Sequence, residues 1–333
     1  MKIKNLGKKF KREIIYASRH GKDLINLNKN FFKRARGSRI IVYHGICLKD
    51  HTKFNGIFLR RDTFEQHIRF YKEYFHIVSL DDFYKKNLNE NKFNICITFD
   101  DGYYNNFKYV LPLMEKHKIP ICFFITTIRD AGYDILWNDL LGIATKYGPD
   151  KIRFNNQEFL KLRNQYTYIK TKERLPDILR RSNFTAKEEM MKTFSELIPF
   201  PNKKEDEDFS RLMKIEDIKQ LSSSLNATIG SHGYYHNDLS EIPIDDCKKE
   251  LVDSKLFLET ICGKKIDSLA FPYGHYTREV VDAAKSTGYD KLLALDFHFE
   301  GDKNDPSMRE RMIMNPYVSI TNQMYAIVKG SYE

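Results

Sequence analysis

Two carboxylates stand side by side at the end of an apolar run. The run reads NICITF and occupies residues 94–99, and Asp100 and Asp101 follow it directly. Adjacent carboxylates at the end of a buried strand repel each other and lose hydration, and both effects disfavour their charged forms. A bound cation would offset this cost, so the pair indicates a metal site.

Two histidines in a second segment complete a set of metal ligands. The segment SHGYYHNDLS, residues 231–240, places His232 and His236 four positions apart. Both imidazoles face one point if this segment turns helically. An isolated pair with this spacing is a weak signal. Together with one of the two aspartates it gives three protein ligands, and the other carboxylate is left to take a proton from water.

Short apolar runs alternate with helical patterns from residue 39 onward, which is typical of a parallel sheet or barrel. Helices are expected at 61–74, 107–118, 244–263 and 278–290. Strands are expected at residues 39–44, 75–80, 94–100, 119–126, 226–232, 267–273, 290–296 and 311–317.

The residues with useful chemistry lie at the carboxyl ends of these expected strands. Asp100, His232, Tyr273 and His44 each stand at or just after the end of a different run. In a parallel barrel the carboxyl ends of the strands and the loops that follow them build the active site. We therefore predict an α/β fold, a distorted parallel (β/α) barrel of about seven strands.

One interval, residues 134–213, interrupts the alternation. It contains helical patches such as NDLLGIATKYG and AKEEMMKTFSELIPF but no convincing series of strands. We interpret it as a helical insertion between two barrel strands. A long disordered loop is the alternative, which the apolar content of the interval disfavours.

The formal net charge of +10 is concentrated at the N-terminus. Residues 1–39 hold 13 lysines and arginines against Glu13 and Asp23. In residues 1–38 apolar side chains recur at helical spacing, so this basic amphipathic segment either lies on an anionic membrane surface or packs on the barrel formed by residues 39–333. No nucleic-acid motif accompanies the charge, so we expect no nucleic-acid partner.

No stretch of the sequence reads as a membrane span or a secretory signal. We therefore expect a cytoplasmic protein, with association at the inner membrane face as a further possibility. Five cysteines form no CxxC pair, and we expect them to be reduced.

Three motifs resemble those of the polysaccharide deacetylase family, also known as the NodB homology or carbohydrate esterase family 4 group. They are TFDDGY, SHGYYH and FPYG at 271–274, within a similarity that runs from about Arg39 to Tyr317. The resemblance implies a metal-dependent hydrolase that removes N-acetyl groups from a sugar of a cell-surface polysaccharide or its lipid-linked precursor. An N-acetylated glycan would be its substrate.

The resemblance also implies roles for the motif residues. Asp100 would be the base that acts on a metal-bound water, and the ligands of a divalent ion, for which we expect zinc, would be Asp101, His232 and His236. The Tyr273 N–H would stabilise the oxyanion, and Arg311, with Arg309 as its rival, would orient Asp100.

The family's C-terminal leucine-x-histidine motif is missing, which leaves the general acid open. His298 is one candidate for this role, although it also fits a surface loop. His44, in VYHG, either lines the site or reaches the acid position. The residues expected to contact substrate are His44, Tyr103, Pro272 and Tyr234.

Two other functions remain open at this stage. One is a hydrolase of the same family that removes formyl or another small acyl group, or acts on a non-sugar amide. The other is a glycan-binding protein on the same fold that has lost turnover.

Overall fold

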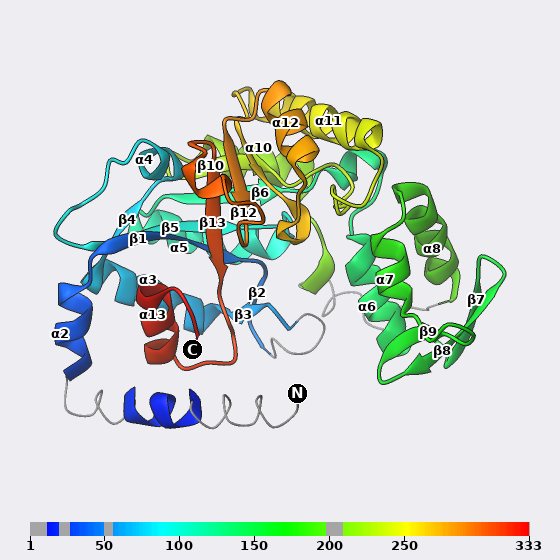
Figure 1. The fold of residues 1–333 in the computed structure, drawn as a ribbon, viewed down its shortest axis with the longest axis horizontal. Helices are drawn as coiled ribbons and strands as arrows, with labels where there is room; N and C mark the ends of the chain where they lie inside the picture. Colours follow the sequence, from blue (N-terminus) through cyan, green and yellow to red (C-terminus); the bar gives the residue numbers. More distant parts are fainter. Residues whose placement is uncertain (1–11, 20–26, 50–55, 198–208, 333) are drawn as a thin grey trace.

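The computed structural model describes residues 12–19, 27–49, 56–197 and 209–332. Its centre is a closed ring of seven parallel strands, in the order β1-β13-β12-β11-β10-β6-β5, with β5 pairing back onto β1 (Figure 1). The strands are β1 (Gly37–Tyr43), β5 (Phe93–Phe99), β6 (Ile121–Ile125), β10 (Ala227–Ser231), β11 (Ser268–Ala270), β12 (Lys291–Ala294) and β13 (Met308–Ile313). The predicted distorted (β/α) barrel is confirmed.

An eighth parallel strand, β4 (Phe75–Val78), pairs with the first half of β5. The second half of the same β5 edge pairs with β6, so β4 extends the sheet without entering the ring. Every apolar run that predicted a strand forms one. Parallel strands covered on both faces read as continuous apolar segments, and β5, with all seven residues buried, shows this pattern.

The predicted helices also form, and they cover the barrel. The helix expected at 61–74 is α3 (Arg61–Tyr74), and the one expected at 278–290 is α12 (Arg278–Ser286). The helix expected at 244–263 is α11 (Ile244–Cys262), which ends at Gly263 with a left-handed φ of 62°. The stretch 107–118 divides into a π-helical turn at Asn106–Val110 and α5 (Leu111–His117). The remaining helices of this layer are α4 (Leu80–Tyr84), α10 (Ile215–Ser223) and α13 (Ile320–Lys329).

The insertion contains helices, as expected, and also an antiparallel sheet that the expectation of a helical insertion did not include. It has helices α6 (Trp137–Tyr147), α7 (Leu175–Arg180) and α8 (Phe184–Leu197). Between α6 and α7 lies an antiparallel sheet of β7 (Lys151–Phe154), β8 (Gln157–Leu162) and β9 (Gln165–Tyr168). Figure 1 shows these green elements grouped beside the barrel.

The insertion has its own hydrophobic core, in which Phe159 and Tyr166 of the sheet are fully buried. Its strands were missed because they are short and carry many charges on their outer face. A turn signal was present in the sequence, since Asn155–Asn156 and Arg163–Asn164 occupy both hairpin turns with positive φ at every position.

The N-terminal segment is helical where the structure describes it. A helix covers residues 12–19, and Ile14 in it is 55% exposed. The following helix, α2 (Leu27–Arg34), packs on the barrel layer: Phe31 stacks on Tyr325 of α13, and Phe32 is buried against Phe70 of α3. The apolar residues Ile3, Leu6, Phe10 and Leu24 of the predicted amphipathic pattern lie outside the described residues.

Two smaller expectations can be compared with the structure. None of the five cysteines, all of which the structure describes, forms a disulfide, and four of them are buried. Among the described helices, none combines the length and apolar character needed to cross a membrane.

Candidate active site

The two aspartates lie in a tight turn at the carboxyl end of β5. Asp100 is held to the neighbouring strand because its N–H donates to the Tyr43 carbonyl (3.0 Å). Asp101 and Gly102 then take left-handed backbone conformations, with φ of 76° and 85°. The turn buries both carboxylates, leaving Asp100 3% and Asp101 4% exposed. A non-glycine residue with positive φ at a buried carboxylate is typical of a functional site.

The two motif histidines converge on Asp101. The Nε2 atoms of His232 and His236 lie 3.4 and 3.3 Å from Asp101 Oδ1. The intervening segment is not helical, so the two rings do not converge through the helical turn considered from the spacing. Instead, Gly233 and His236 have positive φ, 75° and 56°, and this irregular turn aims both rings at one point.

Asp101, His232 and His236 fit a divalent metal ion. Their ligand atoms all lie within 4.8 Å of one another. Donor atoms about 2.0–2.1 Å from a tetrahedral ion lie roughly 3.3–3.4 Å apart, which matches the two distances to Asp101. His232 Nδ1 donates to the Ala270 carbonyl (2.8 Å), which leaves Nε2 as the nitrogen available to a metal ion. The mixed nitrogen and oxygen donor set suits zinc and also other divalent ions.

The electrostatics of Asp101 favour its ionised form. Burial raises the pKa of Asp101, but hydrogen bonds from His232 and His236 outweigh it and hold the pKa well below its usual value. Burial lowers the pKa of His236, which favours the neutral imidazole that a metal requires.

Asp100 has a different partner, the guanidinium of Arg311. Arg311 Nη1 and Nη2 donate to Asp100 Oδ1 and Oδ2 at 2.6 and 2.8 Å, and Arg311 is itself only 4% exposed. His232 Nε2 lies 3.8 Å from Asp100 Oδ2. Burial raises the pKa of Asp100, yet the positive charges of Arg311 and His232 outweigh it and lower the pKa. Asp100 is therefore ionised and oriented, with Oδ2 on the side of the ligand cluster.

Arg309, the rival for this position, lies elsewhere. It precedes Arg311 by two positions in β13, so it lies nearer the amino ends of the strands. There its guanidinium lies over the ring of Tyr84 (4.6 Å) and donates to the Met308 carbonyl (2.6 Å). Arg311 pairs with Asp100 because it lies two residues nearer the carboxyl end of β13 than Arg309 does.

His44 and Tyr273 flank the same cluster. His44 follows β1 and is half-buried, and its Nδ1 has no hydrogen-bond partner among the described residues. Burial lowers the pKa of His44, while the charges of Asp101 and Asp100 act in the opposite direction. Tyr273 has a left-handed backbone (φ 61°), and its ring centroid lies 4.9 Å from that of His236.

The remaining predicted site residues differ in their relation to the cluster: the Tyr103 side chain interacts with the Asp101 carboxylate, whereas His298 lies away from it. His298 is exposed and stacks on the Tyr276 ring (centroids 4.4 Å apart), and no contact between described residues joins it to Asp100. Tyr103 is fully buried, so its ring offers no face to a sugar, contrary to expectation. Tyr234 is half-buried and donates to Asp130 (2.6 Å). Pro272 is buried.

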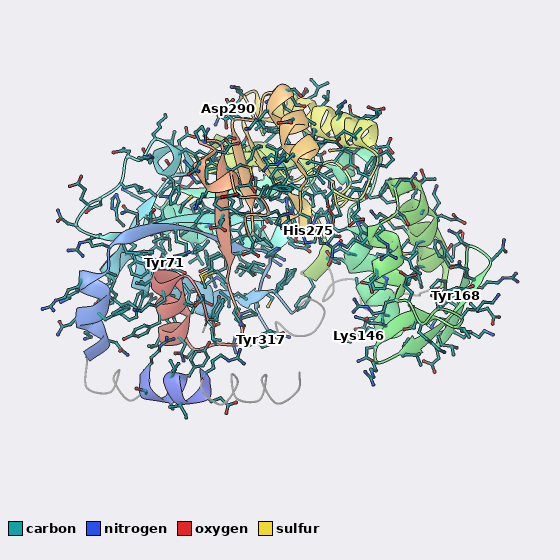
Figure 2. All side chains as sticks on the ribbon, in the orientation of Figure 1. Tyr71, Lys146, Tyr168, His275, Asp290 and Tyr317 are labelled. Carbon is teal, nitrogen blue, oxygen red and sulfur yellow. The ribbon has the colours of Figure 1, made fainter. Side chains whose placement is uncertain are left out.

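Residues of the insertion reach the ligand segments, although no motif or spacing in the sequence indicated them. Tyr103 OH donates to Asp139 of α6 (2.7 Å), where burial raises the pKa of Asp139 to about 8. Arg180 of α7 forms an ion pair with buried Asp238 (2.8 Å), which also contacts His275 (2.9 Å). In Figure 2 the labelled His275 lies where the barrel faces the insertion.

Comparison with known proteins agrees with this barrel. A model described as polysaccharide deacetylase matches residues 87–153 and 200–292. No curated protein matches the sequence. The matched residues include the aspartate turn and the histidine segment, so the chain is similar to polysaccharide deacetylases in the parts that carry the candidate site.

Solved structures share the fold at low sequence identity. The Streptococcus pyogenes deacetylase PplD, solved in complex with acetate, is 14% identical with a TM-score of 0.56, over 87% of this chain and 97% of that one. IcaB from Ammonifex degensii is 15% identical with a TM-score of 0.55, over 89% and 98%. A de-N-acetylase from Aggregatibacter actinomycetemcomitans is 14% identical with a TM-score of 0.53, over 87% and 99%.

Proposed function

We propose that this protein hydrolyses the N-acetyl group of a sugar in a cell-surface polysaccharide or its lipid-linked precursor. The observation that carries the proposal is the pair of buried aspartates with separate partners. Asp101 lies against His232 and His236, while Asp100, beside it, is ion-paired with Arg311. One carboxylate is thus available to a metal ion and the other to a proton.

Asp101, His232 and His236 would hold the divalent ion, for which we propose zinc. When bound, such an ion polarises an amide carbonyl and makes water more acidic. The geometry that favours this assignment is the convergence of three ligand atoms within 4.8 Å of one another.

Asp100 would accept the proton of the attacking water at Oδ2. This oxygen faces the ligand cluster, and the bidentate contact with Arg311 fixes the plane of the carboxylate. A base held in one orientation within hydrogen-bond reach of water contributes typically about 10²–10⁴-fold to the rate. The Tyr273 N–H would donate to the oxyanion of the tetrahedral intermediate.

His44 is the better candidate for the acid that protonates the leaving amine. It lies within the electrostatic reach of Asp100, Asp101 and His232, whereas His298 is exposed and stacked on Tyr276. Asp100 takes one proton from water, and His44 supplies one to the amine as acetate leaves. The balance closes when Asp100 releases its proton to solvent and His44 takes one up.

We also propose that the N-terminal segment binds an anionic membrane surface and brings the enzyme to a lipid-linked substrate at the inner membrane face. The exposed Ile14 in the basic helix at residues 12–19 supports this role. Deleting residues 1–26 tests it and leaves α2 on the barrel. We expect weaker binding to anionic vesicles, together with some loss of stability because Tyr16 contacts Tyr332 and Arg19 lies over the Tyr325 ring. Unchanged vesicle binding would refute the membrane role.

Acetate release from N-acetylglucosamine oligomers and lipid-linked N-acetyl sugars tests the reaction. We expect release by the zinc-loaded protein and a loss of about 10²–10⁴-fold in Asp100→Asn, with zinc content retained. Zinc binding without acetate release from any sugar would instead favour a formyl or other acyl substrate. A protein that binds glycan but no metal would be a silent binding module.

A further inference from the structure

The N-terminal turn of α6 contacts both segments that carry the metal ligands. Trp137 Nε1 donates to the backbone carbonyl of His236 (3.2 Å). Two residues later, Asp139 accepts a hydrogen bond from Tyr103, which follows Asp101 by two positions. One end of one helix in the insertion therefore contacts both the aspartate turn and the histidine segment.

A buried lysine of α8 makes a further contact with the histidine segment. Lys187 is fully buried, and its ammonium donates to Asn237 Oδ1, next to His236. Asn237 Nδ2 in turn donates to Glu250 Oε1 of α11 (2.5 Å), and Glu250 Oε2 accepts the Tyr235 N–H (3.1 Å). The segment is thus held between an insertion cation and a barrel carboxylate.

This lysine is costly to bury. Lysine is almost never fully buried unless it is paired, because the ammonium loses its hydration. Here the compensation comes from Asn237, from the nearby charge of Glu250 and from the face of Trp137, whose ring centre lies 5.0 Å from Nζ. Neighbouring residues of the same helix, Met190 and Met191, fill the insertion core, so Lys187 is directed specifically at the histidine segment.

The histidine segment needs external support. His236 has a left-handed backbone (φ 56°), a conformation that costs a non-glycine residue about 1–3 kcal/mol and persists only where its surroundings fix it. Trp137 contacts the backbone of His236, and Lys187 contacts the side chain of its neighbour Asn237.

We propose that the insertion acts as a clamp that sets the position of the metal ligand His236, with Lys187 and Trp137 as its positioning residues. This inference rests on the proposed metal site. Substitutions of outer partners of metal ligands typically weaken metal affinity by about 10–100-fold, and we expect this range for Lys187→Met. Trp137→Phe, which removes the indole N–H and part of the buried ring, should weaken it less but in the same direction.

Zinc affinity of the full-length protein, measured by competition with a chromophoric chelator, tests the clamp. Lys192→Met is the matched control, because Lys192 lies on the same helix, is 66% exposed and pairs with Glu188. We expect the control to bind zinc as the wild type does. If both Lys187→Met and Trp137→Phe fold and bind zinc within about twofold of the wild type, the clamp is refuted.

Trp137 supplies a second readout that does not depend on activity, since it is the only tryptophan of the chain. We expect zinc to change its emission in the wild type, because the indole is bonded to a ligand residue, and Lys187→Met to shift the zinc-free emission. An emission that neither zinc nor the substitution changes would contradict the clamp. A wild type that binds no zinc would refute the metal site itself, whereas zinc binding with unchanged variants would refute the clamp alone.

Discussion

Removing Arg311 should damage both stability and the proposed base. Its guanidinium makes two hydrogen bonds to Asp100, at 2.6 and 2.8 Å, and both partners are about 96–97% buried. In Arg311→Met the carboxylate of Asp100 stays buried without this partner. Breaking a buried ion pair by removing one member typically costs about 3–5 kcal/mol, because the remaining charge is not compensated.

Arg309→Met is the control for this experiment. Arg309 belongs to the same strand and carries the same charge, but its guanidinium contacts the Tyr84 ring and backbone carbonyls instead of Asp100. A contact of this kind contributes about 0.5–1 kcal/mol. Urea unfolding of both variants therefore separates the ion pair from a general effect of losing an arginine in β13.

The pH profile of kcat/KM gives a second test with a defined sign. Burial raises the pKa of Asp100, and Arg311 is the largest of the contributions that lower it. Without Arg311 the pKa rises, so a smaller fraction of the base is ionised at low pH. The acid limb of the profile should move to higher pH in Arg311→Met and stay in place in Arg309→Met.

The double variant Arg311→Met with Asp100→Asn should recover part of the lost stability, because no unpaired charge remains in the barrel. The loss of unfolding free energy in the double variant should be smaller than the sum of the losses in the two single variants by more than about 1 kcal/mol. Equal stability of Arg311→Met and Arg309→Met, with identical acid limbs, would refute the reasoning.

Three further predictions concern other parts of the site. His44→Gln should lower kcat by about 10²–10⁴-fold at constant zinc content, whereas His298→Gln should leave it unchanged; the reverse pattern in acetate release would contradict our assignment of the acid. Gly274→Ala should destabilise the protein by about 1–3 kcal/mol, because Gly274 has a φ of 74° and an added Cβ would lie 2.5 Å from Leu295 Cγ. Gly301→Ala is the control, since a Cβ there meets nothing within 4 Å. Calorimetry should show a lower stability for the first variant only. Chelation should abolish acetate release and lower the melting temperature, and zinc at 100 times its Kd should restore about 2.7 kcal/mol; a melting temperature indifferent to zinc would argue against the site.

Much of the fold could be predicted because buried parallel strands have a strong local signature. Continuous apolar runs such as residues 94–99 mark the strands, and the polar residues directly after them mark the rim. The hairpins of the insertion escaped prediction because their outer faces are charged and their strands have four to six residues. Their turns at Asn155–Asn156 and Arg163–Asn164 were the signal that could have identified them.

By itself the sequence determined which residues make up the site. Asp100, Asp101, His232 and His236 stand at the ends of strand-forming segments, and these segments can be predicted from short apolar runs. Only the tertiary structure decided that Arg311 and not Arg309 meets Asp100, and that His44 and not His298 flanks the cluster. It also decided that buried Lys187 reaches the histidine segment from the insertion. These choices depend on the closure of the ring and on the packing of the insertion against it. Contacts between segments far apart in the chain leave no periodic trace in the sequence, so local propensity cannot specify them.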